Sequence, residues 1–261
     1  MMFGYMNHMD AFILGVVEGI TEFLPISSTG HLMLTAKLLG LSQTPFLKTF
    51  EISIQLGAIL SVVVLYFKKF LTDIDILKRI LAAFIPTAVS GLIFYKIIKN
   101  IFLNNTQIVL WALFIGGILL ILFEKTHREH EGSTDDLKAF PYPKAFLIGV
   151  FQSAAMIPGV SRSAATILGG LFLGLNRKTI VEFSFLLAVP TMFAATVLDL
   201  SKNIDAFSRD QIGILLMGAG VSFIVAIVSI KFLLHFIKNH NFIWFGAYRI
   251  AAALAFWFII K

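Results

Sequence analysis

Long apolar stretches recur along the 261-residue chain and constrain its fold more than any other feature. A helix needs about 20 apolar residues to cross the hydrocarbon core of a bilayer. Only 14% of the residues are charged, against about 25% in ordinary soluble domains. We therefore expect an all-α integral membrane protein with six transmembrane helices, at 49–67, 76–95, 105–123, 182–199, 210–233 and 241–260.

The charge pattern and the residue types exclude or disfavour some classes of function. The net charge is +6, but the basic residues lie between apolar stretches, which favours contact with lipid headgroups over nucleic acid. The absence of cysteine excludes thiolate chemistry and disulfides. No basic region precedes the first apolar run, so we expect no cleavable signal peptide.

Two further apolar regions, 10–40 and 144–175, are interrupted midway by "FLPISSTG" and "MIPGVSRS". Each half is about 14 residues long, too short to cross a bilayer. Irregular backbone at membrane depth is tolerated where protein or a wet cavity surrounds it. We predict a re-entrant helix hairpin in each region.

Matching residues in the two halves of the chain differ by a nearly constant offset. Pro25 and Pro158 differ by 133 positions, as do Trp111 and Trp244. Chance alignment of apolar sequence is the alternative to a duplication. A duplication gives a first repeat at 1–125, a cytoplasmic linker at 126–143 and a second repeat at 144–261. Each repeat holds one hairpin and three spans, and because three is odd the second repeat must be inverted, as in many transporters.

The orientation follows from the basic residues on each side of the membrane. The side with the loops near 68–79, 124–144, 177–178 and 231–238 carries twelve lysines and arginines, and the other side carries seven. Basic residues concentrate on the cytoplasmic side. We therefore predict that both termini lie outside a plasma membrane.

Polar residues gather at the interruption of the first hairpin. Glu18 and Glu22 are four residues apart, so they share one helix face, and their charges require a divalent cation, a proton or a basic partner. Alternatively, both face water at the interface. Beyond them, His31 could activate the hydroxyl of Ser28 as a nucleophile. The alternative is that Ser27, Ser28 and Thr29 only cap the next helix.

The second hairpin is cationic at its interruption. Arg162 presents a planar fork of donors that suits phosphate, at a predicted helix start that also favours anions. The other candidates for phosphate binding are Gly159, Ser161, Ser163 and Thr166 here, and Ser27 and Thr29 in the first hairpin. If the hairpins meet at the midplane, the carboxylates would hold a metal ion and Arg162 the phosphate. Alternatively, Arg162 forms a structural salt bridge with Glu18 or Glu22.

Other polar residues are less informative. Four of them begin spans and are either partners of the hairpins or helix-start charges: Glu51, Gln55, Glu182 and Ser184. Arg249, inside the last apolar stretch, requires a partner that the sequence does not identify.

The motifs "EGITEFLPISSTGH" and "PGVSRSAAT", with the duplication, resemble the undecaprenyl-diphosphate phosphatase family, also called the bacitracin-resistance family. The resemblance covers essentially the whole chain. It implies removal of the terminal phosphate of undecaprenyl diphosphate with Mg²⁺ or Ca²⁺, which recycles the lipid carrier for peptidoglycan and other wall polymers. It assigns Glu18 and Glu22 to metal binding and catalysis, Ser28 and His31 to nucleophile and base, and Ser161, Arg162, Ser163 and Thr166 to phosphate.

The resemblance also implies a site open to the outer face, with bacitracin competing for the lipid substrate. Attack by Ser28, by His31 or by water fits the same residues. The main alternative is a carrier or flippase that binds polyprenyl phosphate without hydrolysis, because inverted repeats with broken helices also occur in transporters. The sequence leaves the oligomeric state open, a homodimer included.

Overall fold

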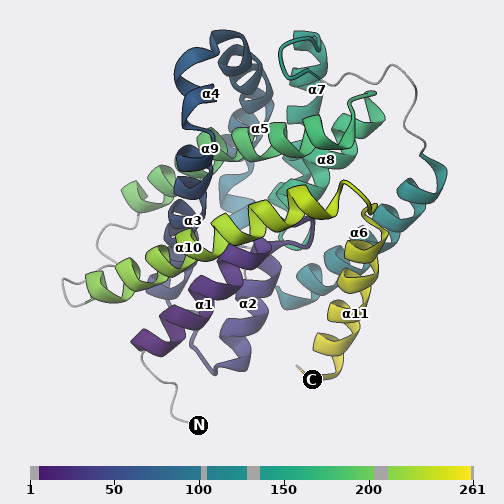
Figure 1. Cartoon of the computed structure of the whole chain (residues 1–261). Coiled ribbons are helices and arrows are strands. Elements are labelled where there is room, and N and C mark those ends of the chain that lie inside the picture. The colour runs from purple at the N-terminus through teal and green to yellow at the C-terminus, as the bar shows by residue number, and fades with distance from the viewer. Residues whose placement is uncertain (1–5, 101–104, 128–135, 203–210, 260–261) are drawn as a thin grey trace.

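The computed structural model describes residues 6–100, 105–127, 136–202 and 211–259, and helices make up nearly all of this part (Figure 1). The ends of two predicted spans, residues 210 and 260, and residues 128–135 of the predicted linker lie outside the described residues.

Five of the described helices are long and apolar enough to cross a membrane, so the chain is a multi-pass membrane protein. They are α3 (Pro45–Leu65), α5 (Ile74–Asn100), α6 (Thr106–Thr126), α9 (Arg177–Lys202) and α10 (Ile212–Phe236). These confirm five of the six predicted spans. The sixth corresponds to α11 (Ile243–Ile259), which is apolar but has only 17 described residues. At 1.5 Å per residue it extends about 25 Å, somewhat less than a hydrocarbon core.

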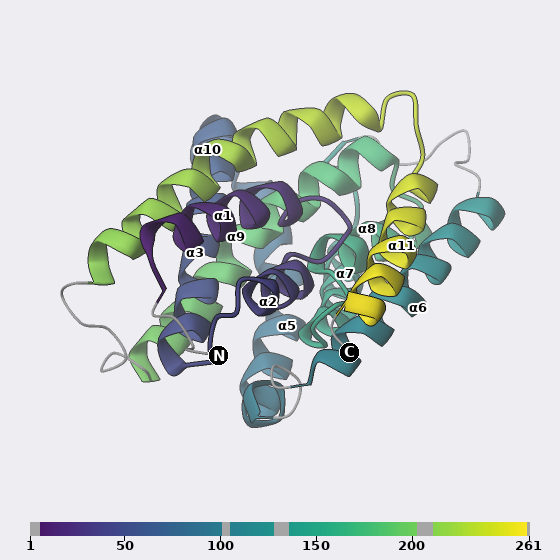
Figure 2. The same cartoon turned by 90° about the horizontal axis from the view of Figure 1, so that it is seen from below.

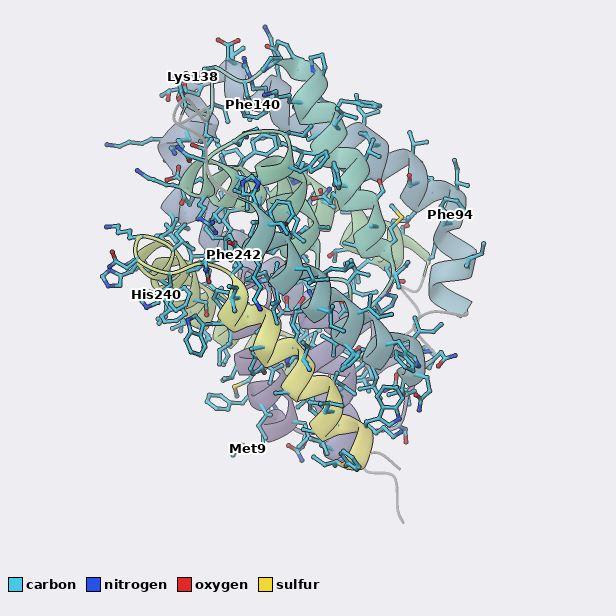
Figure 3. All side chains as sticks on the ribbon, turned by 90° about the vertical axis from the view of Figure 1, so that its right-hand side faces the viewer. Met9, Phe94, Lys138, Phe140, His240 and Phe242 are labelled. Carbon is cyan, nitrogen blue, oxygen red and sulfur yellow. The ribbon has the colours of Figure 1, made fainter. Side chains whose placement is uncertain are left out.

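Large apolar side chains cover the outside of the molecule. Leu92, Phe172 and Phe258 are 66%, 70% and 78% exposed, and side chains of this kind project outward from several helices (Figure 3). A soluble protein rarely exposes so much apolar surface. These faces therefore fit contact with lipid.

Two pairs of short helices occupy the predicted hairpin regions. In the first region, α1 (His8–Thr21) is followed by α2 (Ser28–Leu38). In the second region, α7 (Tyr142–Ser153) and the short 3₁₀ helix η2 (Ala154–Met156) precede α8 (Arg162–Phe172). The interruptions contain Pro25 and Pro158, whose missing N–H groups disfavour a continuous helix.

Glycine lets two of the short helices pack closely on long ones. A Cβ atom at Gly15 of α1 would lie 2.6 Å from the carbonyl oxygen of Gly218 in α10. A Cβ atom at Gly149 of α7 would lie 2.0 Å from the carbonyl oxygen of Ala83 in α5. These contacts fix α1 on α10 and α7 on α5, and thereby place both interruptions in the interior.

The remaining helices complete the bundle. α6 packs against α11, and the two helices lie next to each other in Figure 2; α3 contacts both α9 and α10. The short helix α4 (Phe67–Thr72) connects α3 to α5. The start of α1 and the end of α11 lie at the same end of the molecule (Figure 1). Met9 and Lys138 lie at opposite ends (Figure 3).

Candidate active site

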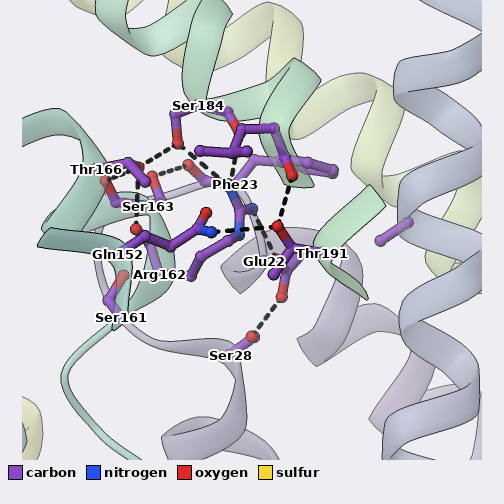
Figure 4. Close-up of polar contacts among 12 residues, drawn as sticks. Glu22, Phe23, Ser28, Gln152, Ser161, Arg162, Ser163, Thr166, Ser184 and Thr191 are labelled. Atoms are coloured by element: carbon purple, nitrogen blue, oxygen red, sulfur yellow. Dashed lines mark hydrogen bonds and ion pairs between the residues drawn. The ribbon is translucent and has the colours of Figure 1, made fainter. Parts of the chain in front are cut away.

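The interruptions of the two helix pairs meet, and an ion pair joins them. Nη2 of Arg162, the first residue of α8, lies 2.8 Å from Oε1 of Glu22, the cap residue directly after α1 (Figure 4). The Glu22 side chain is buried, and the Arg162 side chain is only 11% exposed. The two helix pairs therefore contribute opposite charges to one site. Arg162 and Glu22 form the salt bridge that the sequence analysis gave as one alternative.

Ser28 belongs to the same constellation. Its hydroxyl donates a hydrogen bond of 2.6 Å to Oε2 of Glu22. The two carboxylate oxygens of Glu22 thus contact different groups, one cationic and one a hydroxyl (Figure 4). Such a carboxylate is in position to take the proton of Ser28, since a base must lie within hydrogen-bond reach of the proton it accepts.

A second hydrogen-bond set orients Arg162 from α9. Nη1 of Arg162 donates to the carbonyl oxygen of Ser184 at 2.8 Å and to its hydroxyl at 3.2 Å. Ser184 is fully buried, and it is one of the residues for which the sequence left two roles open. The structure makes it a partner of the second hairpin, whereas Glu182 pairs with Lys69.

Ser163 and Thr166 use their hydroxyls inside the protein. Ser163 donates to the carbonyl oxygen of Phe23 at 2.8 Å, a second link between the two helix pairs. The Thr166 hydroxyl contacts the hydroxyl of Ser184 at 2.6 Å and backbone carbonyls of α8. Both residues are fully buried, so they fit the support of the site better than direct contact with a ligand.

The two helices that start at the site have the same unusual cap. Ser27 precedes α2 with a φ of 73°, and Ser161 precedes α8 with a φ of 77°. In each case the serine hydroxyl accepts a hydrogen bond from the backbone N–H three residues later. Left-handed backbone at a non-glycine residue costs free energy and clusters at functional sites. The hydrogen bond to the N–H of Gly30 confirms the capping role considered for Ser27, and Ser161 has the same role in α8.

The other loop residues lie beside this constellation. Gly159 has a φ of 96°, a conformation that favours glycine, and an added Cβ atom would lie 2.6 Å from the carbonyl oxygen of Val109. Thr29 is half-buried and lines a small cavity together with Lys48, Glu51 and Gln55. Thr29 thus borders the same cavity as the start of α3.

His31 has different partners from those predicted. Its Nδ1 atom lies 2.8 Å from the carbonyl oxygen of Ser27, and its Nε2 atom lies 2.9 Å from the hydroxyl of Tyr248. A carbonyl only accepts, so Nδ1 carries the proton and Nε2 of the neutral ring accepts from Tyr248. His31 thus holds the backbone at Ser27, while the hydroxyl of Ser28 is directed to Glu22.

Glu18 is fully buried one helical turn before Glu22 and lies beside its carboxyl group, and no donor group hydrogen-bonds to the Glu18 oxygens. A buried acceptor without a partner is costly, and a metal ion would satisfy it. Mg²⁺ is commonly held by one or two carboxylates together with substrate phosphates. Glu18 and Glu22 fit this donor set, although the described residues contain no cluster of three or more His, Cys, Asp or Glu ligands.

Sequence reasoning missed two residues around the site and the partners of a third. Tyr248 contacts His31, but nothing in an aromatic residue of an apolar stretch signals this. Gln152 is buried and donates to Thr87 and Thr191. It lies 134 positions after Glu18, so the predicted repeat could have pointed to it. The partners of Arg249 are backbone carbonyls, which no search for acidic residues would identify.

These features define a class: a polytopic helical membrane protein whose buried carboxylates, serine and arginine converge from two interrupted helix pairs. The model of the family described as "Bacitracin resistance protein BacA" matches residues 11–255. The undecaprenyl-diphosphatase of Sulfurihydrogenibium sp. (strain YO3AOP1) is 57% identical over 252 residues, which cover 97% of this chain and 99% of that protein.

More distant relatives carry the same name. The undecaprenyl-diphosphatase of Aquifex aeolicus is 53% identical, over 96% of this chain and 98% of that protein. The undecaprenyl-diphosphatase of Thermus thermophilus is 46% identical, over 98% of this chain and 99% of that protein. The chain therefore belongs to the bacitracin resistance protein BacA family, which confirms the resemblance that the two motifs indicated.

Proposed function

We propose that the chain is an undecaprenyl-diphosphatase that hydrolyses the terminal phosphate of undecaprenyl diphosphate, releasing undecaprenyl phosphate and phosphate. The observation that carries this proposal is the double contact of Glu22, with Ser28 on one oxygen and Arg162 on the other. A binding site for an anion requires Arg162. It does not require a serine hydroxyl directed at a buried carboxylate.

In the proposed reaction Ser28 Oγ attacks the terminal phosphorus, and its proton passes to Oε2 of Glu22. The bond from phosphorus to the bridging oxygen breaks, and undecaprenyl phosphate leaves. Glu22 passes this proton to the departing undecaprenyl phosphate, which frees the carboxylate to act again. Water then attacks the phosphoserine, Glu22 takes a proton from this water and gives it to Ser28 Oγ, and the serine hydroxyl is restored as phosphate leaves. Arg162 stabilises the charge on the phosphoryl oxygens, a role suited to its bidentate fork.

Glu18 and Glu22 would hold a Mg²⁺ or Ca²⁺ ion, which when bound supplies positive charge to diphosphate oxygens. The orphaned oxygens of Glu18 support this assignment. The first turns of α2 and α8 supply free backbone N–H groups near the same place. His31 positions the Ser27 backbone at the start of α2, where Ser28 is the next residue.

The proposed fold is an inverted repeat with two re-entrant hairpins. Three observations support it. The short helices α1, α2, α7 and α8 have 11 to 14 residues. The caps Ser27 and Ser161 differ by 134 positions, close to the offset between the halves. α1 of the first half packs on α10 of the second half. In the same way α7, the equivalent of α1, packs on α5, the equivalent of α10.

The proposed orientation has both termini outside and the site open to the outer face of the plasma membrane. The lipid tail then stays among the apolar helix faces while the diphosphate enters from the aqueous side. An enzyme that consumes undecaprenyl diphosphate there would also reduce the target available to bacitracin.

The test is release of phosphate by purified protein in detergent, from undecaprenyl diphosphate and from farnesyl diphosphate, with Mg²⁺ and with chelator. We expect metal-dependent release that Ser28→Ala lowers by about 100-fold or more. The matched control is Ser61→Ala, because Ser61 is also buried but donates to Ala58 of its own helix. Tight binding of the lipid by wild type without release would contradict hydrolysis and favour the carrier.

A further inference from the structure

Arg249 of α11 is fully buried, and its guanidinium donates five hydrogen bonds to backbone carbonyls. Nη1 donates to Val160 at 2.9 Å and to Pro25 at 3.3 Å. Nη2 donates to Gly159 at 2.8 Å and to Ala112 at 3.0 Å. Nε donates to Leu113 at 3.3 Å. A charge without water is costly, and these five carbonyl dipoles compensate it.

The five carbonyls come from three separate segments. Pro25 lies in the interruption of the first hairpin, between Glu22 and Ser28. Gly159 and Val160 lie in the interruption of the second hairpin, directly before Ser161 and Arg162. The other two carbonyls belong to α6. One guanidinium thus joins the two active-site loops to each other and to a long helix.

We propose that Arg249 is a positioning residue that sets the distance between the two hairpin loops, and thereby the alignment of Glu22, Ser28 and Arg162. This inference rests on the proposed function for its catalytic consequence. Arg249 lies outside the reacting groups and acts through backbone carbonyls, so its substitution displaces the catalytic side chains without removing any of them.

Gly116 provides the space that this arrangement needs. An added Cβ atom at Gly116 would lie 2.0 Å from Nη2 of Arg249. Under the offset of 133 that relates Trp111 to Trp244, Gly116 is also the position equivalent to Arg249. One copy of the repeat therefore carries the arginine, and the other carries the glycine against which its guanidinium packs.

Lysine cannot reproduce this geometry. A guanidinium has five N–H donors in a rigid plane, whereas an ammonium group has three on a compact centre. Arg249→Lys keeps the positive charge but cannot reach carbonyls on three segments. We expect kcat for phosphate release to fall about 10- to 100-fold, the range typical of residues that orient functional groups through a second layer. KM should change much less than kcat, because Arg162 and the carboxylates remain.

The matched control is Arg79→Lys. Arg79 is another buried arginine, and it donates to the backbone carbonyls of Phe140 and Asp75, away from the site. We expect Arg79→Lys to lower the melting temperature in detergent about as much as Arg249→Lys does, while its kcat stays at the wild-type value. If Arg79→Lys and Arg249→Lys lower kcat by the same factor for the same loss of melting temperature, the proposal is overturned.

Two further measurements keep the inference testable if one variant folds poorly or the wild type releases no phosphate. Gly116→Ala retains Arg249 but pushes its guanidinium away, and it should lower kcat in the same way. Amide hydrogen exchange should accelerate in both 22–28 and 157–162 in Arg249→Lys, and in neither loop in Arg79→Lys. Unchanged exchange in both loops would overturn the positioning role whatever the activity. Absent hydrolysis by wild type would instead overturn the proposed function.

Discussion

Glu22 makes the two contacts on which the proposed chemistry depends, one within its own hairpin and one with the other hairpin. Removing Arg162 would leave a buried carboxylate without its cationic partner, and removing Ser28 would leave it without its proton donor. Single substitutions in this set therefore change the charge or hydrogen bonding of the whole set.

Ser163 is predicted to contribute stability through its link to the first hairpin. Ser163→Ala leaves the buried carbonyl of Phe23 without this donor, which costs about 1 to 3 kcal/mol. Thermal unfolding in detergent measures the loss. Ser153→Ala is the control, because Ser153 donates to Gly149 of its own helix. Equal, small shifts for both variants would show that the link between hairpins contributes nothing.

Glu18 is predicted to act through the metal ion. Glu18→Gln keeps the shape of the side chain but removes its charge, so the Mg²⁺ concentration that gives half-maximal phosphate release should rise about 10-fold or more. A titration of activity with Mg²⁺ after chelation measures it. An unchanged metal requirement together with a lower kcat would instead assign Glu18 a role other than metal binding.

At the scale of helices, close packing through glycine determines where the two helix pairs lie. The contact between Gly149 and the backbone of Ala83 holds α7, which leads to the interruption directly before Arg162. Gly15 has the equivalent contact for α1 and Glu22. Small residues at such contacts are typical of membrane helices, because they let backbones approach closely.

Gly149→Ala is predicted to disrupt both stability and activity. The added Cβ atom would lie 2.0 Å from a carbonyl oxygen of α5, so α7 must move away. The control is Gly220→Ala in α10, where nothing lies within 4 Å of the added atom. Since alanine favours helix over glycine, that control should be neutral or slightly stabilising. Similar melting temperatures and activities for both variants would contradict the packing argument.

At the scale of the molecule, much of the fold follows from apolar periodicity and the proline interruptions. Those signals predicted five helices that the structure confirms, and they located both broken regions. They could not show that Ser28 is directed to Glu22 while His31 contacts Tyr248, because residue spacing does not specify rotamers or long-range partners. The role of Arg249 was equally hidden, since any residue can supply a backbone carbonyl.

The predicted orientation can be measured directly, because the chain has no cysteine to remove. Met9 and Lys138 are exposed and lie at opposite ends of the molecule (Figure 3). A membrane-impermeant maleimide should label Met9→Cys in intact cells, and Lys138→Cys only after permeabilisation. The reverse pattern would contradict the assignment of the termini to the outside.

The central claim is that residues from the two halves of the chain form one catalytic site. A double-mutant cycle of Glu22→Asp and Arg162→Lys, with kcat/KM for undecaprenyl diphosphate as the readout, tests it most directly. We predict that each substitution lowers kcat/KM about 100-fold and that the double variant is little worse than either single variant, because groups that act as a unit are strongly non-additive. Losses that multiply, to about 10⁴-fold in the double variant, would show that the two residues act independently and would contradict a shared site.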